Sequence, residues 1–361
     1  MPIPKSTVRR LSLSLCANYL HKHKSQPMQW DDWFGLQHVP VIDVRSEAEF
    51  EQGHFPGAIN LPLFANQERH QVGKIYKQQG RQEAILKGLE FVGSKMHKLA
   101  QTALQIQQNH QLRLYCWRGG MRSQSMAWLF EQVGIQSSPL IGGYKTFRQW
   151  VLNQFSKKYH LKIVGGETGS RKTEVLHALQ GLGEQIIDLE GFASHKGSAF
   201  GALEGLPQPT TEQFENNLAL WLCQLDSERC IWVEDESSLI GTVHLPNELF
   251  KQIQQAPLYC LKVPKNQRVI HLVQSYGHFS KAQLAFAIQR IEKRIGKVVM
   301  QQALLALQEG DLAQVASLAL TYYDKAYAAQ LAKRTSPIYP LAVETSLAPW
   351  QVAQMLRELP A

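Results

Sequence analysis

Cysteine is scarce in this 361-residue chain, which contains five of them and no C-x-x-C pair. So few thiols exclude a disulfide framework, and their spacing offers no zinc-binding motif. No apolar run is long enough to span a membrane. Ser, Cys and Asn interrupt the N-terminal stretch, which is therefore unlike the apolar core of a secretory signal. These absences predict a soluble, cytoplasmic protein with no membrane partner.

The length suits two ordinary domains that each bury a core. We expect a first domain over 1–155 and a second over 156–361, the latter with an α/β part at 160–265 and a helical part at 266–361. Residues 1–155 contain 18 Lys and Arg against 10 Asp and Glu, and the remainder contains 20 against 20, so the whole excess of +8 lies in the first part. This asymmetry favours a polyanionic partner, most simply nucleic acid, although a solubilising surface would give the same counts.

The stretch YCWRGGMRS at 115–123 has the pattern of a nucleophile loop. An apolar strand precedes it and an amphipathic helix follows, so Cys116 is expected at a strand end beside inward-pointing backbone N–H groups. A thiol attacks as its thiolate, which nearby cations stabilise. We therefore predict Cys116 as the catalytic residue, with Arg118 and Arg122 supplying the cations and Gly119 and Gly120 forming the turn.

The run D-V-R-x-x-x-E-F-x-x-G-H-x-P-G-A-x-N at 43–60 resembles the signature of rhodanese domains. The resemblance covers roughly 15–150 and places Cys116 where that family carries sulfur as a persulfide. It also implies supporting roles for Asp43 and Arg45. The spacing here is C-x5-R, whereas common sulfurtransferases resemble C-x4-R. A wider loop suits a tetrahedral phosphorus oxyanion, which keeps a rhodanese-fold phosphatase open, although Tyr115 stands where those phosphatases usually carry His.

The second half opens with LKIVGGETGSRKTEV at 161–175, the strand, glycine-bearing loop and Lys-Thr pair of a phosphate-binding P-loop. Arg171 stands where the usual pattern has its second glycine, so the arginine either crowds the loop or adds a cation toward a diphosphate. We predict that the loop binds a diphosphate. The diphosphate-binding candidates are Gly166, Thr168, Gly169, Ser170, Arg171, Lys172 and Thr173.

Acidic residues end the strand IWVEDE at 231–236, and a Gly-rich loop follows the strand near 187, both of which are places where P-loop folds carry substrate-binding groups. The candidates there are Asp188, Glu190, His195, Lys196, Ser198, Glu234 and Asp235. No metal ligand is assigned and no tightly bound cofactor is expected. Whether Mg²⁺ binds near Glu234 and Asp235 stays open.

Basic residues and one tyrosine on three predicted helical segments are candidate RNA contacts, with solvated helix faces as the alternative for the basic residues. They are Lys74, Lys77 and Arg81 in a helical insertion, Tyr144, Lys145 and Arg148 after a Gly-Gly turn, and Arg290 and Arg294 in the helical part.

Both halves together resemble the tRNA 2-selenouridine synthase family. The shared motifs are C-W-R-G-G-M-R-S, D-L-E-G-x-A-x-H-K-G-S-x-F-G, P-Q-P-T-x-E-x-F-E-N, W-V-E-D-E-S and Y-Y-D-x-x-Y. The implied fold is a rhodanese-like α/β domain followed by a P-loop, nucleotide-kinase-like α/β domain with a helical C-terminal part. The implied activity is that of a transferase that replaces sulfur by selenium in wobble 2-thiouridine of tRNA, through an S-geranyl intermediate.

The resemblance also implies co-substrates and partners. Geranyl diphosphate and selenophosphate would be co-substrates, Cys116 would carry selenium as an S-selanyl group, and a selenophosphate-producing enzyme would supply the donor. We expect the two steps to use different domains. The alternatives are a rhodanese-type sulfurtransferase or phosphatase with an accessory P-loop domain, and a non-catalytic tRNA-binding protein. The oligomeric state and the tRNAs used stay open.

Overall fold

The structure is a computed structural model that describes residues 25–343 and 348–359 apart from Ala199, Ala202, Glu204 and Leu206. The chain divides into two compact units, one ending at Asn153 and the other beginning at Gln154. No helix within the described residues is both long and apolar enough to cross a membrane.

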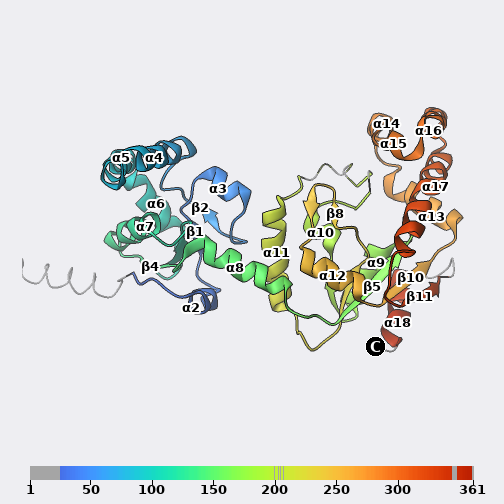
Figure 1. The fold of residues 1–361 in the computed structure, drawn as a ribbon, viewed down its shortest axis with the longest axis horizontal. Helices are drawn as coiled ribbons and strands as arrows, with labels where there is room; N and C mark the ends of the chain where they lie inside the picture. The colour runs from blue at the N-terminus through green and yellow to red at the C-terminus, as the bar shows by residue number, and fades with distance from the viewer. Residues whose placement is uncertain are drawn as a thin grey trace, which may run out of the picture. The chain divides into compact units, whose positions relative to one another are not determined.

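Unit 1 is built on a four-stranded parallel sheet with the order β2-β1-β3-β4 (Figure 1). The strands are β1 (Val41–Asp43), β2 (Ile59–Asn60), β3 (Gln111–Tyr115) and β4 (Gln136–Pro139). The helices are α2 (Trp30–Gly35), α3 (Glu47–Gln52), α4 (Asn66–Gln78), α5 (Arg81–Gly93), α6 (Met96–Ile106), α7 (Met121–Gln132) and α8 (Gly143–Phe155). Helices cover a parallel sheet on each side, so β3 is buried along LRLY. Its one charged residue, Arg113, donates to the carbonyl oxygens of Val39 and Trp33 at 2.9 and 3.0 Å.

Two apolar groups fill the space around this sheet. Aliphatic side chains of β1 and β3 pack with Met126 and Phe130 of α7. An aromatic group that includes Trp33, Phe55 and Phe147 packs around Tyr115, the last residue of β3. Together they hold the end of β3 rigidly, and the loop that follows it carries Cys116.

Unit 2 contains a five-stranded parallel sheet with the order β11-β10-β5-β7-β6 and a small antiparallel hairpin. The strands are β5 (Leu161–Gly166), β6 (Gln185–Ile187), β7 (Ile231–Glu234), β8 (Leu239–Ile240), β9 (Val243–His244), β10 (Leu258–Lys262) and β11 (Ile338–Ala342). Helices α9 (Lys172–Gly181) and α18 (Pro349–Glu358) pack in one apolar cluster with the sheet.

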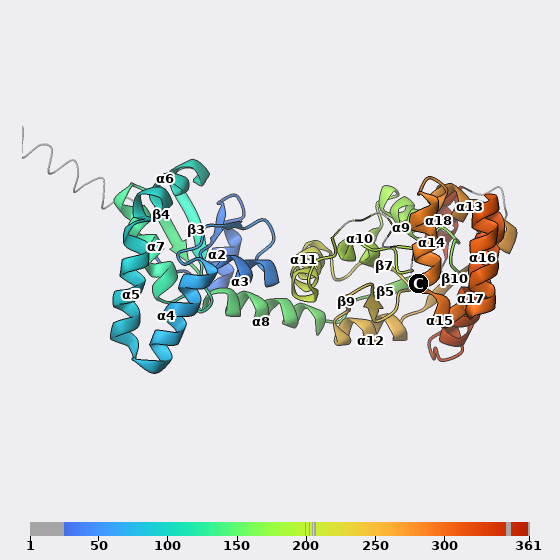
Figure 2. The same ribbon diagram turned by 90° about the horizontal axis from the view of Figure 1, so that it is seen from above.

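The remaining helices of unit 2 flank the sheet or extend beyond it. They are α10 (Leu189–Ala193), α11 (Thr211–Gln224), α12 (Asn247–Gln255), α13 (Lys265–Tyr276), α14 (Lys281–Arg290), α15 (Glu292–Ile295), α16 (Lys297–Glu309) and α17 (Leu312–Leu331). Figures 1 and 2 show α14, α15 and α16 grouped at one end of this unit. Leu284, Ala303 and Val315 belong to the apolar cluster that joins α14, α16 and α17.

The expected helical part at 266–361 contains α14 to α18, but it also contains β11, which returns to the sheet and pairs in parallel with β10. The segment IYPLA contains Pro340, which reads as a break in a strand. It is tolerated here because β11 lies at the edge of the sheet, where one row of backbone groups needs no partner strand.

Candidate active site and diphosphate site

Cys116 lies between the end of β3 and the start of α7, and its side chain is buried, with the residue 3% exposed. The Sγ atom lies 3.3 Å from Oγ of Ser123 and 3.9 Å from the carbonyl oxygen of Gly120. Gly119 has a φ of 65°, and a Cβ there would lie 2.5 Å from the carbonyl oxygen of Leu140. Only glycine fits this turn, so the tight loop around the thiol depends on it.

A second loop supports the nucleophile loop from behind. The backbone N–H groups of Tyr144 and Lys145, in the first turn of α8, donate to the carbonyl oxygens of Cys116 and Trp117 at 2.8 and 3.1 Å. Gly143 has a φ of 62°, and a Cβ there would collide with the Cys116 carbonyl. The start of α8 therefore fixes the backbone that carries the thiol.

The pair Asp43 and Arg45 is a buried brace under this loop. Arg45 donates to Oδ2 of Asp43 at 2.6 Å and to the carbonyl oxygen of Gly53 at 2.6 Å. Its guanidinium also stacks 3.7 Å from the ring centroid of Tyr144. Tyr144 is 0% exposed, so in this structure it is a scaffold residue, and its proposed role as a tRNA contact is wrong.

The two arginines of the loop differ in whether their charge is paired within the protein. Arg122 donates to Oε2 of Glu49 at 2.8 Å, which ties α7 to α3. Arg118 is exposed and has no ion pair or hydrogen bond within the described part of the chain. Arg118 is thus the cation of this loop that is available to an incoming anion, and Arg122 holds the loop in place.

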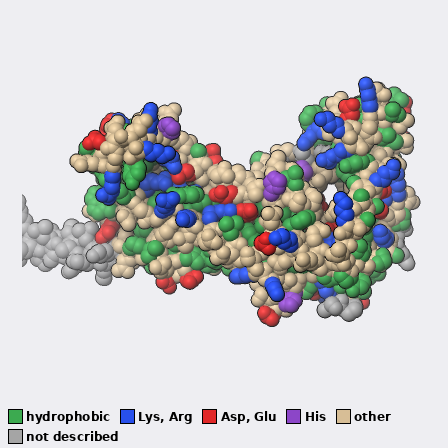
Figure 3. Space-filling view, in the orientation of Figure 1, with side chains coloured by type: hydrophobic (Ala, Val, Ile, Leu, Met, Phe, Trp, Pro, Cys, Tyr) green, Lys and Arg blue, Asp and Glu red, His purple; other side chains and the backbone are tan. Residues whose placement is uncertain are grey.

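The basic helical insertion reaches the same loop. Nη2 of Arg81, the first residue of α5, lies 3.8 Å from Sδ of Met121, which begins α7. Lys74 and Lys77 are exposed on α4, which packs against α5. Figure 3 shows Lys and Arg side chains over the face of unit 1 that carries these helices. Lys145 of α8 is also exposed and Arg148 is half-buried, while Arg290 and Arg294 are exposed on the helices of unit 2.

The P-loop of unit 2 connects β5 to α9. Nζ of Lys172 donates to the carbonyl oxygen of Gly166 at 3.0 Å, and Oγ1 of Thr173 donates to Oε2 of Glu190 at 3.0 Å. Arg171 adopts the left-handed conformation, with φ 63° and ψ 30°, that glycine supplies in the usual pattern. Its guanidinium pairs with Glu174 at 2.5 Å, so the charge of Arg171 is already engaged within α9.

A polar cavity of about 600 Å³ lies over this loop. It is lined by every diphosphate-binding candidate and by Asp188, Glu190, His195, Lys196, Ser198 and Asp235. Glu234 is instead fully buried below the cavity, where Oε1 accepts the N–H of Glu190 at 2.7 Å. The helix N-terminus, Lys172 and Lys196 together make this cavity suited to an anion.

Carboxyl groups crowd one wall of the cavity. Glu236, which ends the acidic run IWVEDE but was not among the named candidates, lines it. Burial together with the charge of Glu190 raises the pKa of Glu236 to about 8. Burial also raises the pKa of Glu190 and that of Glu234. No cluster of three or more His, Cys, Asp or Glu side chains in the described residues is arranged to hold a metal ion.

Residues far along the chain position the P-loop. The hydroxyl of Tyr327 accepts the N–H of Gly166 at 2.8 Å and donates to Oδ2 of Asp235 at 3.0 Å. Arg334 pairs with the same carboxylate at 3.0 Å, so Asp235 is a structural partner of the loop and not a free acid. The Y-Y-D-x-x-Y motif includes Tyr327, but only the tertiary structure shows that its hydroxyl contacts Gly166 and Asp235.

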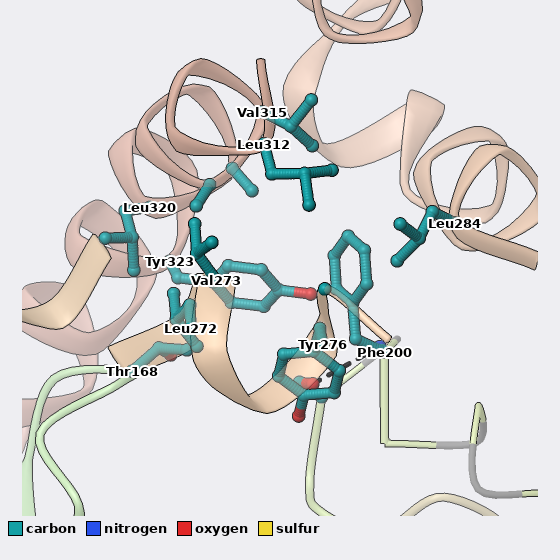
Figure 4. Close-up of a pocket in the computed structure, with 14 residues that line it drawn as sticks. Thr168, Phe200, Leu272, Val273, Tyr276, Leu284, Leu312, Val315, Leu320 and Tyr323 are labelled. Carbon is teal, nitrogen blue, oxygen red and sulfur yellow. Dashed lines mark hydrogen bonds between the residues drawn. The ribbon is translucent and has the colours of Figure 1, made fainter. Parts of the chain in front are cut away.

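An apolar pocket (Figure 4) adjoins the polar cavity, because the two have lining residues in common. The two share five lining residues, which are Thr168, Ser198, Leu272, Tyr276 and Tyr323. Beyond them the walls are aliphatic side chains of α14 and α17, such as Leu284, Leu312 and Val315, together with Phe200. The pocket is narrow, with a volume of about 60 Å³, and the rings of Phe200 and Tyr276 lie 5.9 Å apart beside it.

The fold and the two sites define a rhodanese-like domain joined to a P-loop domain. A rhodanese-like domain model matches residues 27–150, and a model described as the tRNA 2-selenouridine synthase AAA domain matches 159–357. The chain belongs to the tRNA 2-selenouridine synthase family, and the predicted fold class is confirmed.

Two relatives carry the name of this family, and one solved domain is similar in sequence. The tRNA 2-selenouridine synthase of Aeromonas salmonicida (strain A449) is 34% identical over 84% of this chain and 90% of its own length. The protein of the same name from Sulfurovum sp. (strain NBC37-1) is 36% identical over 84% and 92%. A solved N-terminal domain of a protein described as ATP/GTP-binding, from Clostridium difficile 630, is 39% identical over 35% of this chain and 99% of its own, with a TM-score of 0.34.

Proposed function

We propose that this protein is a transferase that converts 2-thiouridine at the tRNA wobble position to 2-selenouridine. In this proposal it acts in the cytoplasm in two steps, geranylation in unit 2 and selenium transfer in unit 1. The observation that carries the proposal is the continuity of an anion-binding cavity with an apolar pocket, in a chain that also bears a buried thiol in a glycine-rich loop. A prenyl diphosphate has the matching chemistry, with a charged head and an apolar tail.

In the first step the diphosphate of geranyl diphosphate binds the loop N–H groups and Lys172. The tail enters the apolar pocket, and because the pocket is narrow it does so by parting Phe200 from Tyr276. The thiocarbonyl sulfur of the base attacks the first carbon of the tail, the carbon–oxygen bond breaks, diphosphate leaves and the N3 proton is lost. No hydrolysis is needed, which agrees with a P-loop whose second glycine is replaced by Arg171.

P-loop sites commonly take Mg²⁺. Within the described residues, protein side chains alone do not form a metal cluster, but Mg²⁺ keeps waters and binds substrate phosphates, so the oxygens of Thr173 and Glu190, 3.0 Å apart, are the groups that would hold it together with the diphosphate. When bound, Mg²⁺ would neutralise charge on the leaving diphosphate. No tightly bound cofactor is proposed.

In the second step selenium replaces the geranylated sulfur at C2 of the base. A C2–Se bond forms, the C2–S bond breaks and geranylthiol leaves. Selenophosphate from a separate selenophosphate-producing enzyme would be held at Cys116, with its phosphate bound by Arg118 and the loop N–H groups. If Cys116 carries selenium as S–Se⁻, its thiolate forms a bond to selenium, the P–Se bond breaks, and the electron pair of that bond stays on phosphorus, which leaves as phosphite. Direct hydrolysis of the donor instead gives phosphate. The phosphorus product therefore reports the route.

The test is nucleoside mass analysis of tRNA containing 2-thiouridine after incubation with the full chain. Geranyl diphosphate alone should yield the S-geranyl nucleoside, and addition of selenophosphate should yield 2-selenouridine. Formation of neither product would refute the proposal. Turnover of thiosulfate or of a phosphoester without tRNA would instead favour a sulfurtransferase or a phosphatase.

A further inference from the structure

Trp117 follows the buried thiol directly, yet its own side chain is 39% exposed. Its ring centroid lies 5.7 Å from that of the buried Tyr144 and 5.9 Å from the guanidinium carbon of Arg45. Its carbonyl oxygen accepts the N–H of Lys145 at 3.1 Å. The ring is thus held from the protein side by Tyr144 and Arg45, while a large part of the surface of this residue, the next one after Cys116, is exposed to solvent.

The surroundings of this ring are cationic. Arg118 is the next residue, is exposed and has no partner within the described residues. Lys145 is exposed on α8, and Arg81 reaches Met121 at the start of α7. Aromatic platforms surrounded by Lys and Arg are how proteins bind unpaired nucleotides, because every base has a face that stacks and every phosphate a charge.

We propose that Trp117 is the platform on which the modified pyrimidine stacks during selenium transfer. This inference rests on the proposed function, and it names a binding residue for the acceptor base. Stacking on Trp117 would set the C2 position of the base beside the group held at Cys116, and Arg118 and Lys145 would contact the flanking phosphates. The alternative occupant is a protein, such as the enzyme that supplies the donor, and the experiment below separates the two.

The experiment uses the full chain and tRNA that already carries S-geranyl-2-thiouridine. Three variants are compared, Trp117→Ala, Trp117→Phe and the control Trp128→Ala. Trp128 lies on α7 in the same unit and is 55% exposed, so it matches Trp117 in type and solvent contact. The KM for tRNA in selenium transfer and the Kd for the anticodon stem-loop are measured for each. The rate of Cys116 alkylation by iodoacetamide reports whether the loop remains folded.

Loss of one stacking contact should raise both the KM and the Kd by about 10- to 100-fold in Trp117→Ala. Trp117→Phe should restore most of the affinity, and Trp128→Ala should match the wild type, with Cys116 alkylation unchanged throughout. The proposal is overturned if Trp117→Ala binds the stem-loop as tightly as Trp128→Ala does, which would leave the ring to a protein partner. It is also overturned if Trp117→Phe fails to rescue or if alkylation changes, since either shows a structural role. If the wild type makes no selenated product, the proposed function fails, and the stem-loop Kd still tests the platform.

Discussion

Loss of Arg268 of α13 should strongly weaken the P-loop unit. Its guanidinium is buried, donates to both carboxylate oxygens of Asp324 at 2.8 and 3.0 Å, and contacts the carboxylate of Glu167 at 3.2 Å. It also donates to the carbonyl oxygen of Thr168 within the loop at 3.2 Å. One side chain therefore joins α13, α17 and the P-loop.

The loss of folding free energy follows from the two carboxylates, Asp324 and Glu167, that Arg268→Met leaves without a cation. Removing one partner of a buried ion pair costs about 3 to 5 kcal/mol, because the other charge stays uncompensated. Asp324 and Glu167 are 24% and 27% exposed, so water solvates them in part and the lower end applies. We expect a loss of about 3 kcal/mol, which for a unit of this size lowers Tm by roughly 6 to 12 °C.

Hydrogen exchange at the amides of β5 and α17 measures the free energy of unfolding of unit 2 within the full chain. Arg357→Met on the exposed face of α18 is the matched control and should cost less than about 0.5 kcal/mol. Asp324→Asn in the Arg268→Met background should recover part of the loss, since one stranded carboxylate is removed. The reasoning is wrong if Arg268→Met resembles the control. Geranylation should fall with stability, while Cys116 alkylation in unit 1 stays unchanged.

Three further outcomes are expected. Cys116→Ser should abolish selenium transfer and leave geranylation largely intact, and equal loss of both products in nucleoside mass analysis would contradict two separate sites. Lys172→Ala should raise the KM for geranyl diphosphate about 10- to 100-fold, as expected for a lost charged hydrogen bond, and an unchanged KM would remove Lys172 from the site. Because the pKa of Glu236 is raised to about 8 in the folded state, its contribution to stability is present below pH 4.5 and is lost as pH rises toward 8. In buffer with EDTA, Glu236→Gln should therefore flatten the fall in Tm between pH 5 and 8, and an unaltered slope would argue against the raised pKa.

The sequence predicted those residues whose roles depend on the local backbone. The loop of Cys116 and the loop of Lys172 each lie between an apolar strand and an amphipathic helix, and those periodicities are local properties of the chain. The glycine missing at Arg171 also marked a real feature, because the backbone there keeps the left-handed conformation despite the side chain. Such features need no knowledge of distant partners.

The roles that depended on partners were decided only by the tertiary structure. Sequence order could not show that Arg122 binds Glu49 while Arg118 stays open, or that Asp235 is engaged by Arg334 and Tyr327. Nor could it show an apolar pocket beside the P-loop, since its walls come from segments that lie far apart in the chain. The sequence alone determined the two loops and the family, because local patterns and motifs encode them. Folding decided which charges remain free for a ligand, because pairing and burial arise only when distant segments meet.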